Sequence, residues 1–147
     1  MFDTDKIEIN AAFYELFESV FNEDFFEVLS TIRPSNRIKA LRERATVIVK
    51  EGDEEKKIID MSKLEEDEQK ELTDFNIKAG LKAKKYTSRI AYIGTLLHEK
   101  KYQGSYQGFM AFLASCDAND FLNPEITRKI WEKITKDQAA PTSVKNV

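Results

Sequence analysis

The sequence has few residues that interrupt regular structure: three prolines and five glycines among 147 residues. Proteins built mainly of strands need frequent turn residues, so this scarcity favours long helices. The single cysteine, Cys116, excludes an intramolecular disulfide. Because the first ten residues also lack the apolar core of a signal peptide, we expect a cytoplasmic protein. The longest apolar run covers residues 90–97, whereas a membrane-spanning helix needs roughly 20 such residues, so we expect no membrane segment.

The composition is that of a folded chain, with 41% hydrophobic and 33% charged residues. Its length fits one domain, and we predict a mainly α-helical bundle over residues 1–137. Residues 138–147 show no periodicity and contain Pro141 among small polar residues, so we predict a disordered tail. The net charge of −3 gives no reason to expect nucleic acid or an anionic membrane as the partner.

The longest helical pattern lies in the middle of the chain. Ser62 and Glu65 form a candidate capping box before it. Gly80 and Gly94 weaken such a helix but are tolerated where another helix packs closely, and a break near residues 87–88 stays open. The apolar residues of this pattern are spaced by three and four: Leu72, Phe75, Ala79, Ala83, Tyr86, Ile90, Ile93 and Leu97.

Shorter patterns predict further helices on both sides. Phe13 to Phe21 form one apolar stripe, and Asn22 or Asp24 can cap the next helix, which ends before Pro34. Asn123 and Pro124 are a strong start for the last helix.

One segment breaks the helical pattern. Residues 46–49 are Thr-Val-Ile-Val, which favours a strand, and residues 51–55 read as a polar turn. A β-hairpin near residues 46–61 is therefore predicted, with a helix as the alternative that the sequence leaves open.

No group of residues matches a catalytic, metal or cofactor site. His98 and Cys116 lack a third group to orient them and a known nucleophile signature. An EF-hand loop beginning at Asp117 would place Leu122 where glycine is required and Arg128 where glutamate is required. We therefore expect neither an enzyme nor a metal or cofactor, and predict a protein-interaction module.

Charge is segregated along the middle of the chain. Residues 51–71 carry ten acids and four lysines, a local net charge of −6, whereas residues 78–101 carry seven bases and one acid, a local net charge of +6. Two solvated faces or an internal pairing explain this pattern without a function. The functional interpretation is head-to-tail association, in which the acidic patch of one subunit meets the basic patch of the next.

The C-terminal block from Phe109 to Trp131, followed by the loose tail 140–147, resembles the tail assembly chaperones of long-tailed, non-contractile bacteriophages (siphovirus type). The resemblance covers the general layout and the C-terminal third and rests on no invariant signature. It implies a non-catalytic helical viral protein that oligomerises and coats the tape-measure protein until tail-tube subunits replace it. It also implies a longer form made by ribosomal frameshifting.

Partner-binding residues follow from exposure and charge. The alternative function is a small regulatory module that binds nucleic acid or another protein through the basic helix 78–101. Adjacent residues of a helix face different directions, so one of two neighbouring phenylalanines is expected outside the core. The candidate contact residues are Phe25, Phe26, Lys82, Lys84, Lys85, Arg89, Tyr102 and Tyr106.

Overall fold

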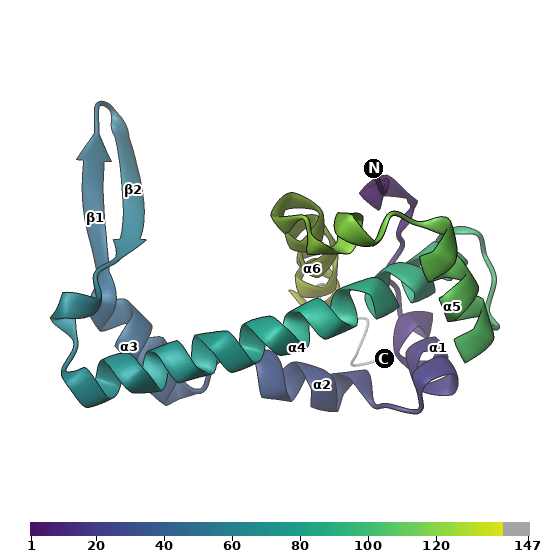
Figure 1. Ribbon diagram of the computed structural model, residues 1–147, viewed down its shortest axis with the longest axis horizontal. Coiled ribbons are helices and arrows are strands. Elements are labelled where there is room, and N and C mark those ends of the chain that lie inside the picture. The colour runs from purple at the N-terminus through teal and green to yellow at the C-terminus, as the bar shows by residue number, and fades with distance from the viewer. Residues whose placement is uncertain (140–147) are drawn as a thin grey trace. The chain divides into compact units, whose positions relative to one another are not determined.

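The computed structural model describes residues 1–139 and is mainly α-helical with one β-hairpin, as the sequence predicts (Figure 1). The last eight residues of the predicted disordered tail lie outside the described residues, and the last helix extends to Ala139. The helices are α1 (Ala12–Phe21), α2 (Phe25–Ile32), α3 (Asn36–Ala45), α4 (Glu66–His98), α5 (Tyr106–Ser115) and α6 (Pro124–Ala139), with 3-10 turns η1 (Thr4–Lys6), η2 (Met61–Lys63) and η3 (Ala118–Leu122). The hairpin consists of β1 (Thr46–Glu51) and β2 (Glu54–Ile59).

Contacts along the chain divide it into two compact units, and the single domain over residues 1–137 stays a prediction. We call Ser30–Lys82 the hairpin unit, and Met1–Leu29 together with the chain from Ala83 the aromatic unit. The boundaries fall within α2 and within α4. Each unit is described by itself.

The aromatic unit is built on phenylalanine rings from its two N-terminal helices. Phe13, Phe17 and Phe25 are almost completely buried. The ring centroids of Phe17 and Phe25 lie 4.8 Å apart, and the rings of Phe13 and Phe25 meet edge to face at 5.1 Å. Such edge-to-face pairs add to the stability that comes from the buried area. α4 and α6 add buried aliphatic residues to this core: Ile90, Ile93, Leu97, Ile126, Ile130 and Ile134.

Because Gly94 of α4 has no side chain, the N-terminal segment can pack directly against this helix. A Cβ atom at position 94 would lie 2.3 Å from Cγ2 of Ile7, and the backbone N–H of Glu8 donates to the carbonyl of Gly94 at 3.0 Å. The sequence prediction was that another helix packs closely on this glycine. The segment is extended chain, however, and not the helix that was expected.

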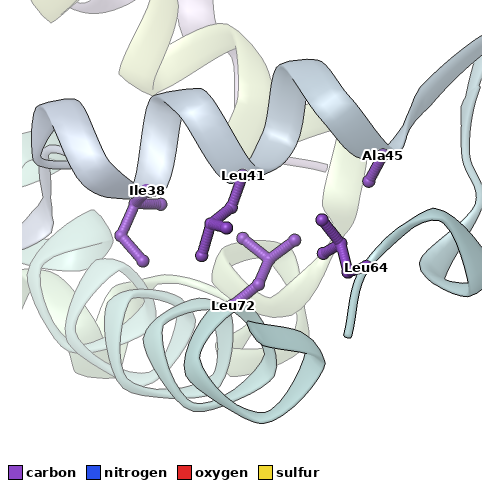
Figure 2. Packing of buried hydrophobic residues seen from close by; sticks show 5 residues of the cluster. All are labelled: Ile38, Leu41, Ala45, Leu64 and Leu72. Carbon is purple, nitrogen blue, oxygen red and sulfur yellow. The ribbon is translucent and has the colours of Figure 1, made fainter. Parts of the chain in front are cut away.

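The hairpin unit has a smaller, aliphatic core. Figure 2 shows Ile38 and Leu41 of α3 pointing toward Leu72 of α4. Leu64 and Ala45 complete the buried cluster, and Met61 and Phe75 pack against it from its edge. This cluster joins α3 to the first turns of α4.

The start of α4 corrects the sequence prediction. Ser62 belongs to η2, where its backbone N–H and hydroxyl both bond to the carboxylate of Asp60. The capping interaction lies three residues later, where the carboxylate of Glu68 accepts the backbone N–H of Glu65 at 3.1 Å. A glutamate lies three residues after Ser62 and also three residues after Glu65. The spacing that defines a capping box therefore does not distinguish these two cap positions, and the prediction took the wrong one. The helix also continues without the break considered near residues 87–88, where the Thr87 hydroxyl bonds to the carbonyl of Ala83.

Of the two alternatives near residues 46–61, a hairpin or a helix, the structure forms the hairpin. Gly52 has a φ of +63°, and Asp53, the second turn residue, is not among the described residues with positive φ. A two-residue loop with glycine in the first position matches the twist of antiparallel strands. The β-branched Thr-Val-Ile-Val segment therefore pairs with β2, with Val47 opposite Ile58 and Val49 opposite Lys56.

Candidate interaction surfaces

The hairpin places apolar side chains on both of its faces. Cross-strand partners share a face, and faces alternate along each strand, so Val47, Val49 and Ile58 lie on one face and Ile48 and Ile59 on the other. Every residue of β2 is exposed, and only the first two residues of β1 are partly buried. Within the hairpin unit, these strands extend away from α3 (Figure 1). Neither apolar face is covered within the hairpin unit.

The charged residues of the hairpin differ between its two faces. The face of Val49 and Ile58, which we call the acidic face, also carries Lys56, Glu51 and Glu54. The face of Ile48 and Ile59, which we call the basic face, also carries Lys50, Lys57 and Glu55. The local charge is thus −1 on the acidic face and +1 on the basic face.

A second apolar surface lies on α4 within the same unit. Ile77 and Leu81 are 56% and 64% exposed and are four residues apart, so they share one face of the helix. Their face lies opposite to that of Leu72, which is buried in the core. Lys78 and Lys82 are exposed and flank this pair. We call these four residues the α4 stripe.

The sequence prediction missed Ile77 and Leu81 because one apolar stripe had already been assigned to α4. The spacing of four between them was a visible signal of a second stripe. The run Val47-Ile48-Val49 carried a similar signal. Three consecutive apolar residues in a strand cannot all face one side.

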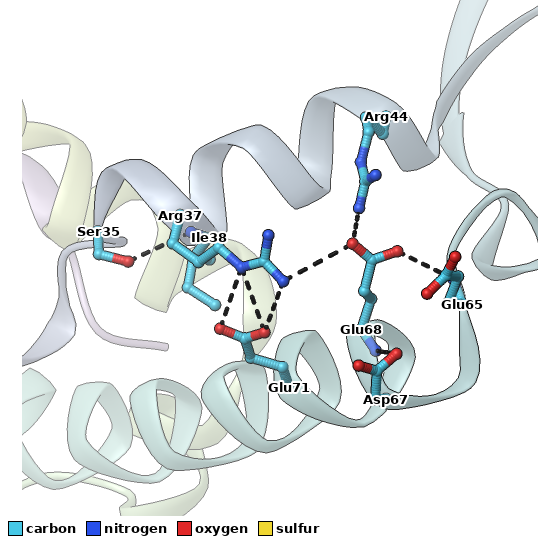
Figure 3. Close-up of polar contacts among 8 residues, drawn as sticks. All are labelled: Ser35, Arg37, Ile38, Arg44, Glu65, Asp67, Glu68 and Glu71. Atoms are coloured by element: carbon cyan, nitrogen blue, oxygen red, sulfur yellow. Dashed lines mark hydrogen bonds and ion pairs between the residues drawn. The ribbon is translucent and has the colours of Figure 1, made fainter.

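Part of the predicted acidic patch is used internally (Figure 3). Glu68 forms ion pairs with Arg44 and, at 3.7 Å, with Arg37, while Glu71 pairs with Arg37 at 3.3 Å. The Glu65 N–H and the two arginines hold the pKa of the Glu68 carboxyl below its ordinary value. These acids therefore fasten α3 to α4.

The acids of the hairpin turn remain free for other contacts. Glu51, Asp53, Glu54 and Glu55 are exposed, and within residues 1–139 no ion pair engages them. The predicted acidic patch thus separates into a structural part on α4 and an uncompensated part at the hairpin turn.

The predicted basic patch separates in the same way. Lys82, Lys84 and Lys85 are exposed. Arg89, by contrast, pairs with Glu23 at 2.6 Å, and its guanidinium lies 4.8 Å from the ring centroid of Phe21. Arg89 is therefore engaged inside the aromatic unit, and the prediction that it contacts a partner is not supported.

The four aromatic candidates are also divided. Phe26, Tyr102 and Tyr106 are each at least half exposed. Phe25 is buried, so the prediction that it is a surface contact is wrong. The reason is the turn of the helix by about 100° per residue, which sends Phe25 inward and Phe26 outward. Phe26 stacks on Tyr14 with ring centroids 4.3 Å apart.

Two shallow hollows lie on the aromatic unit. One of about 300 Å³ is lined by Tyr102 and by Ala12, Glu15, Leu16 and Ser19. The other, of about 370 Å³, is lined by nine residues: Met1, Phe2, Asp3, Lys6, Thr95, Ser115, Cys116, Asp117 and Asp120. Over the part of the chain that the structure describes, no three His, Cys, Asp or Glu side chains are grouped closely enough to hold a metal ion.

Each helix within residues 1–139 is either too short or too polar to cross a lipid bilayer. Comparison with protein-family models, with curated proteins and with solved structures gives no match for this chain. Arguments about its function therefore rest on its own residues and geometry.

Proposed function

We propose that the protein is a non-catalytic tail assembly chaperone of a long-tailed bacteriophage, which self-associates and holds the tape-measure protein during tail assembly. The observation that carries this proposal is the uncovered apolar surface of the hairpin unit, on both hairpin faces and on the α4 stripe. Exposed apolar surface of this kind marks protein–protein contact sites. The resemblance of the C-terminal block to this chaperone family supports the choice of role.

A chaperone for a long helical partner needs an exposed apolar strip that accepts an amphipathic helix. The aromatic unit offers such a strip on α5, where Tyr106 and Met110 are half exposed and four residues apart. Tyr102 lies in the connector before this helix and borders a hollow with Glu15. We assign the tape-measure contact to this surface and expect tail-tube subunits to displace it.

The exposed Lys82, Lys84 and Lys85 favour a second candidate, a regulator that binds nucleic acid through residues 78–101. Binding of this kind weakens steeply with salt because phosphate contacts release counterions. The net charge of −3 and the internal ion pair of Arg89 argue against it. We therefore place it behind the chaperone proposal.

Two measurements test the proposal. Light scattering after size exclusion, over a range of protein and salt concentrations, should show an oligomer that grows with concentration and loosens with salt. Co-expression with a siphovirus tape-measure protein should recover both chains together, and Tyr106→Ser with Met110→Ser should reduce this recovery. Phe26→Ser is the matched control, since it removes an exposed aromatic side chain from another helix.

A chain that stays monomeric and does not retain the tape-measure protein would contradict the chaperone proposal. Tight binding of a 30-base-pair DNA duplex at 50 mM salt, lost at 200 mM salt, would instead support the regulator.

A further inference from the structure

The hairpin unit carries two apolar surfaces that residues 1–139 of its own chain do not cover. The acidic face of the hairpin presents Val49 and Ile58, and the α4 stripe presents Ile77 and Leu81, all at least 37% exposed. The apolar side chains of both surfaces are exposed in the same copy, so the two surfaces do not pack against each other within the unit. Residues 1–139 of the same copy therefore do not cover them, and a second copy can.

The hairpin in particular lacks the support that such a structure needs. A lone two-stranded hairpin is marginally stable in water and becomes stable when an apolar face packs against another element. At its base, the Asp60 N–H donates to the Ala45 carbonyl at 2.7 Å, and the N–H and hydroxyl of Thr46 donate to carbonyls of α3. Packing of the acidic face against a helix would supply the missing contact.

Charge complementarity selects the occupant. On the acidic face, Glu51 and Glu54 face each other across the strands at the turn end, beyond Val49 and Ile58. On the α4 stripe, Lys78 and Lys82 flank Ile77 and Leu81. The apolar centres of the two surfaces thus match, and the acidic face, which carries a charge of −1 with Lys56 included, is opposite in sign to the lysines of the stripe. The basic face of the hairpin, with Lys50 and Lys57, would instead repel these lysines.

We propose that the acidic face of the hairpin of one copy docks on the α4 stripe of a second copy. The two surfaces are different, so the contact is heterologous, and a pair of copies keeps one free stripe on the first copy and one free hairpin on the second. Copies added in this way form a ring or an open spiral. This inference rests on the self-association in the proposed function and identifies the residues that produce it.

A charge exchange between two full-length variants tests the contact. The first variant, Glu51→Lys with Glu54→Lys, has a basic hairpin and the native basic stripe. The second, Lys78→Glu with Lys82→Glu, has the native acidic hairpin and an acidic stripe. Each alone opposes like charges, so the dissociation constant for self-association should rise about tenfold, measured by sedimentation velocity at low salt. Mixed in equal amounts, they should associate again, because each hairpin then meets a stripe of opposite charge.

The matched control is Lys50→Glu with Lys57→Glu, which reverses two charges on the other hairpin face and should leave association of the parent strength. Ile77→Ser with Leu81→Ser should weaken association while circular dichroism shows unchanged helicity. If the parent associates but the charge variants associate equally well, or the mixture gains nothing over either variant, this contact is wrong while self-association stands. A parent that is monomeric at every concentration overturns both this contact and the self-association of the proposed function.

Discussion

The two units of the molecule treat their apolar residues differently. In the aromatic unit, the phenylalanines of α1 and the isoleucines of α6 are buried, and ring centroids lie 4.3 to 6.5 Å apart. In the hairpin unit, a cluster of five small or aliphatic residues forms the core. Six aliphatic residues of the same unit are exposed: Ile48, Val49, Ile58, Ile59, Ile77 and Leu81.

This difference indicates which unit is complete by itself. A small unit has a high ratio of surface to volume and buries a smaller share of its apolar area. A sequence that nevertheless keeps β-branched and leucine side chains at exposed positions is suited to association, since such surface is stabilised only when a partner covers it. The exposed residues of the aromatic unit are mostly aromatic or methionine and come from several segments, with Tyr106 and Met110 together on α5.

The largest expected effects come from the two cores. Phe17→Ala removes a ring that contacts Phe13, Phe21 and Phe25, and should lower the free energy of unfolding by about 3–5 kcal/mol. Leu72→Ala should lower it by about 2–5 kcal/mol in the hairpin unit. Urea titrations should follow the fluorescence of Trp131, the only tryptophan, for the aromatic unit, and methyl NMR signals of Ile38 for the hairpin unit.

Leu81→Ala is the control for these core substitutions, because an exposed side chain should change stability by about 0.5 kcal/mol or less. If either core substitution shifts the fluorescence and NMR transitions by the same amount, the two units unfold as one, and the contrast between them loses its thermodynamic meaning.

A pair of glycines in α4 sharpens the contrast with a smaller effect. In Gly94→Ala the new methyl group would overlap Ile7, so the free energy of unfolding should fall by about 1–3 kcal/mol. In Gly80→Ala the new methyl group meets nothing within 4 Å, so better helix propensity should raise stability by about 1 kcal/mol. Thermal denaturation of both variants measures the difference. Equal signs would show that Ile7 does not pack on α4 in solution.

The smallest effects are expected at the extremes of pH. The hairpin unit should lose stability at acid pH and the aromatic unit at alkaline pH. The pKa of Glu68 is lower in the folded protein than its ordinary value of 4.5. The ionised carboxylate therefore stabilises the hairpin unit fully at pH values above 4.5, and this stabilisation is lost as the pH falls through the pKa of the folded state. Burial, and then the bond to Glu23, raises the pKa of Tyr86 to about 12 from 10.0. The aromatic unit therefore keeps this stability below pH 10 and loses it as pH rises toward 12.

Glu68→Gln and Tyr86→Phe separate these two limbs. With Glu68→Gln, the stability of the hairpin unit, followed by the Ile38 methyl signal, should depend less on pH in the acid range. With Tyr86→Phe, the stability of the aromatic unit, followed by Trp131 fluorescence, should depend less on pH in the alkaline range. If Glu68→Gln does not change the pH dependence in the acid range, the loss of stability at low pH comes from other carboxylates.

Local residue patterns were sufficient for several elements of the fold. Asp24 caps α2 with a 2.9 Å bond to the Phe26 N–H, and Asn123 with Pro124 begins α6. These interactions span two or three residues, so the sequence contains them entirely. The hairpin was left open against a helix because its choice depends on pairing between Val47 and Ile58, which are separated by the turn.

The interaction surfaces show the limit of such patterns. Lys82, Lys84 and Arg89 have the same charge and lie within eight residues, yet Glu23 of a distant segment engages Arg89 alone. Likewise, Glu68 and Glu54 are both acidic, and only Glu68 meets the arginines of α3. No local pattern distinguishes members of such a pair, because their partners are remote in sequence.

The sequence by itself determined the helical class, the caps of α2 and α6, the hairpin as one of two choices, and the separation of acidic from basic residues along the chain. All of these follow from local spacing and composition. Only the tertiary structure decided which apolar residues are covered and which charges are compensated. Burial and ion pairing depend on contacts between distant segments, and those contacts left the hairpin and the stripe of Ile77 and Leu81 without a cover in the hairpin unit.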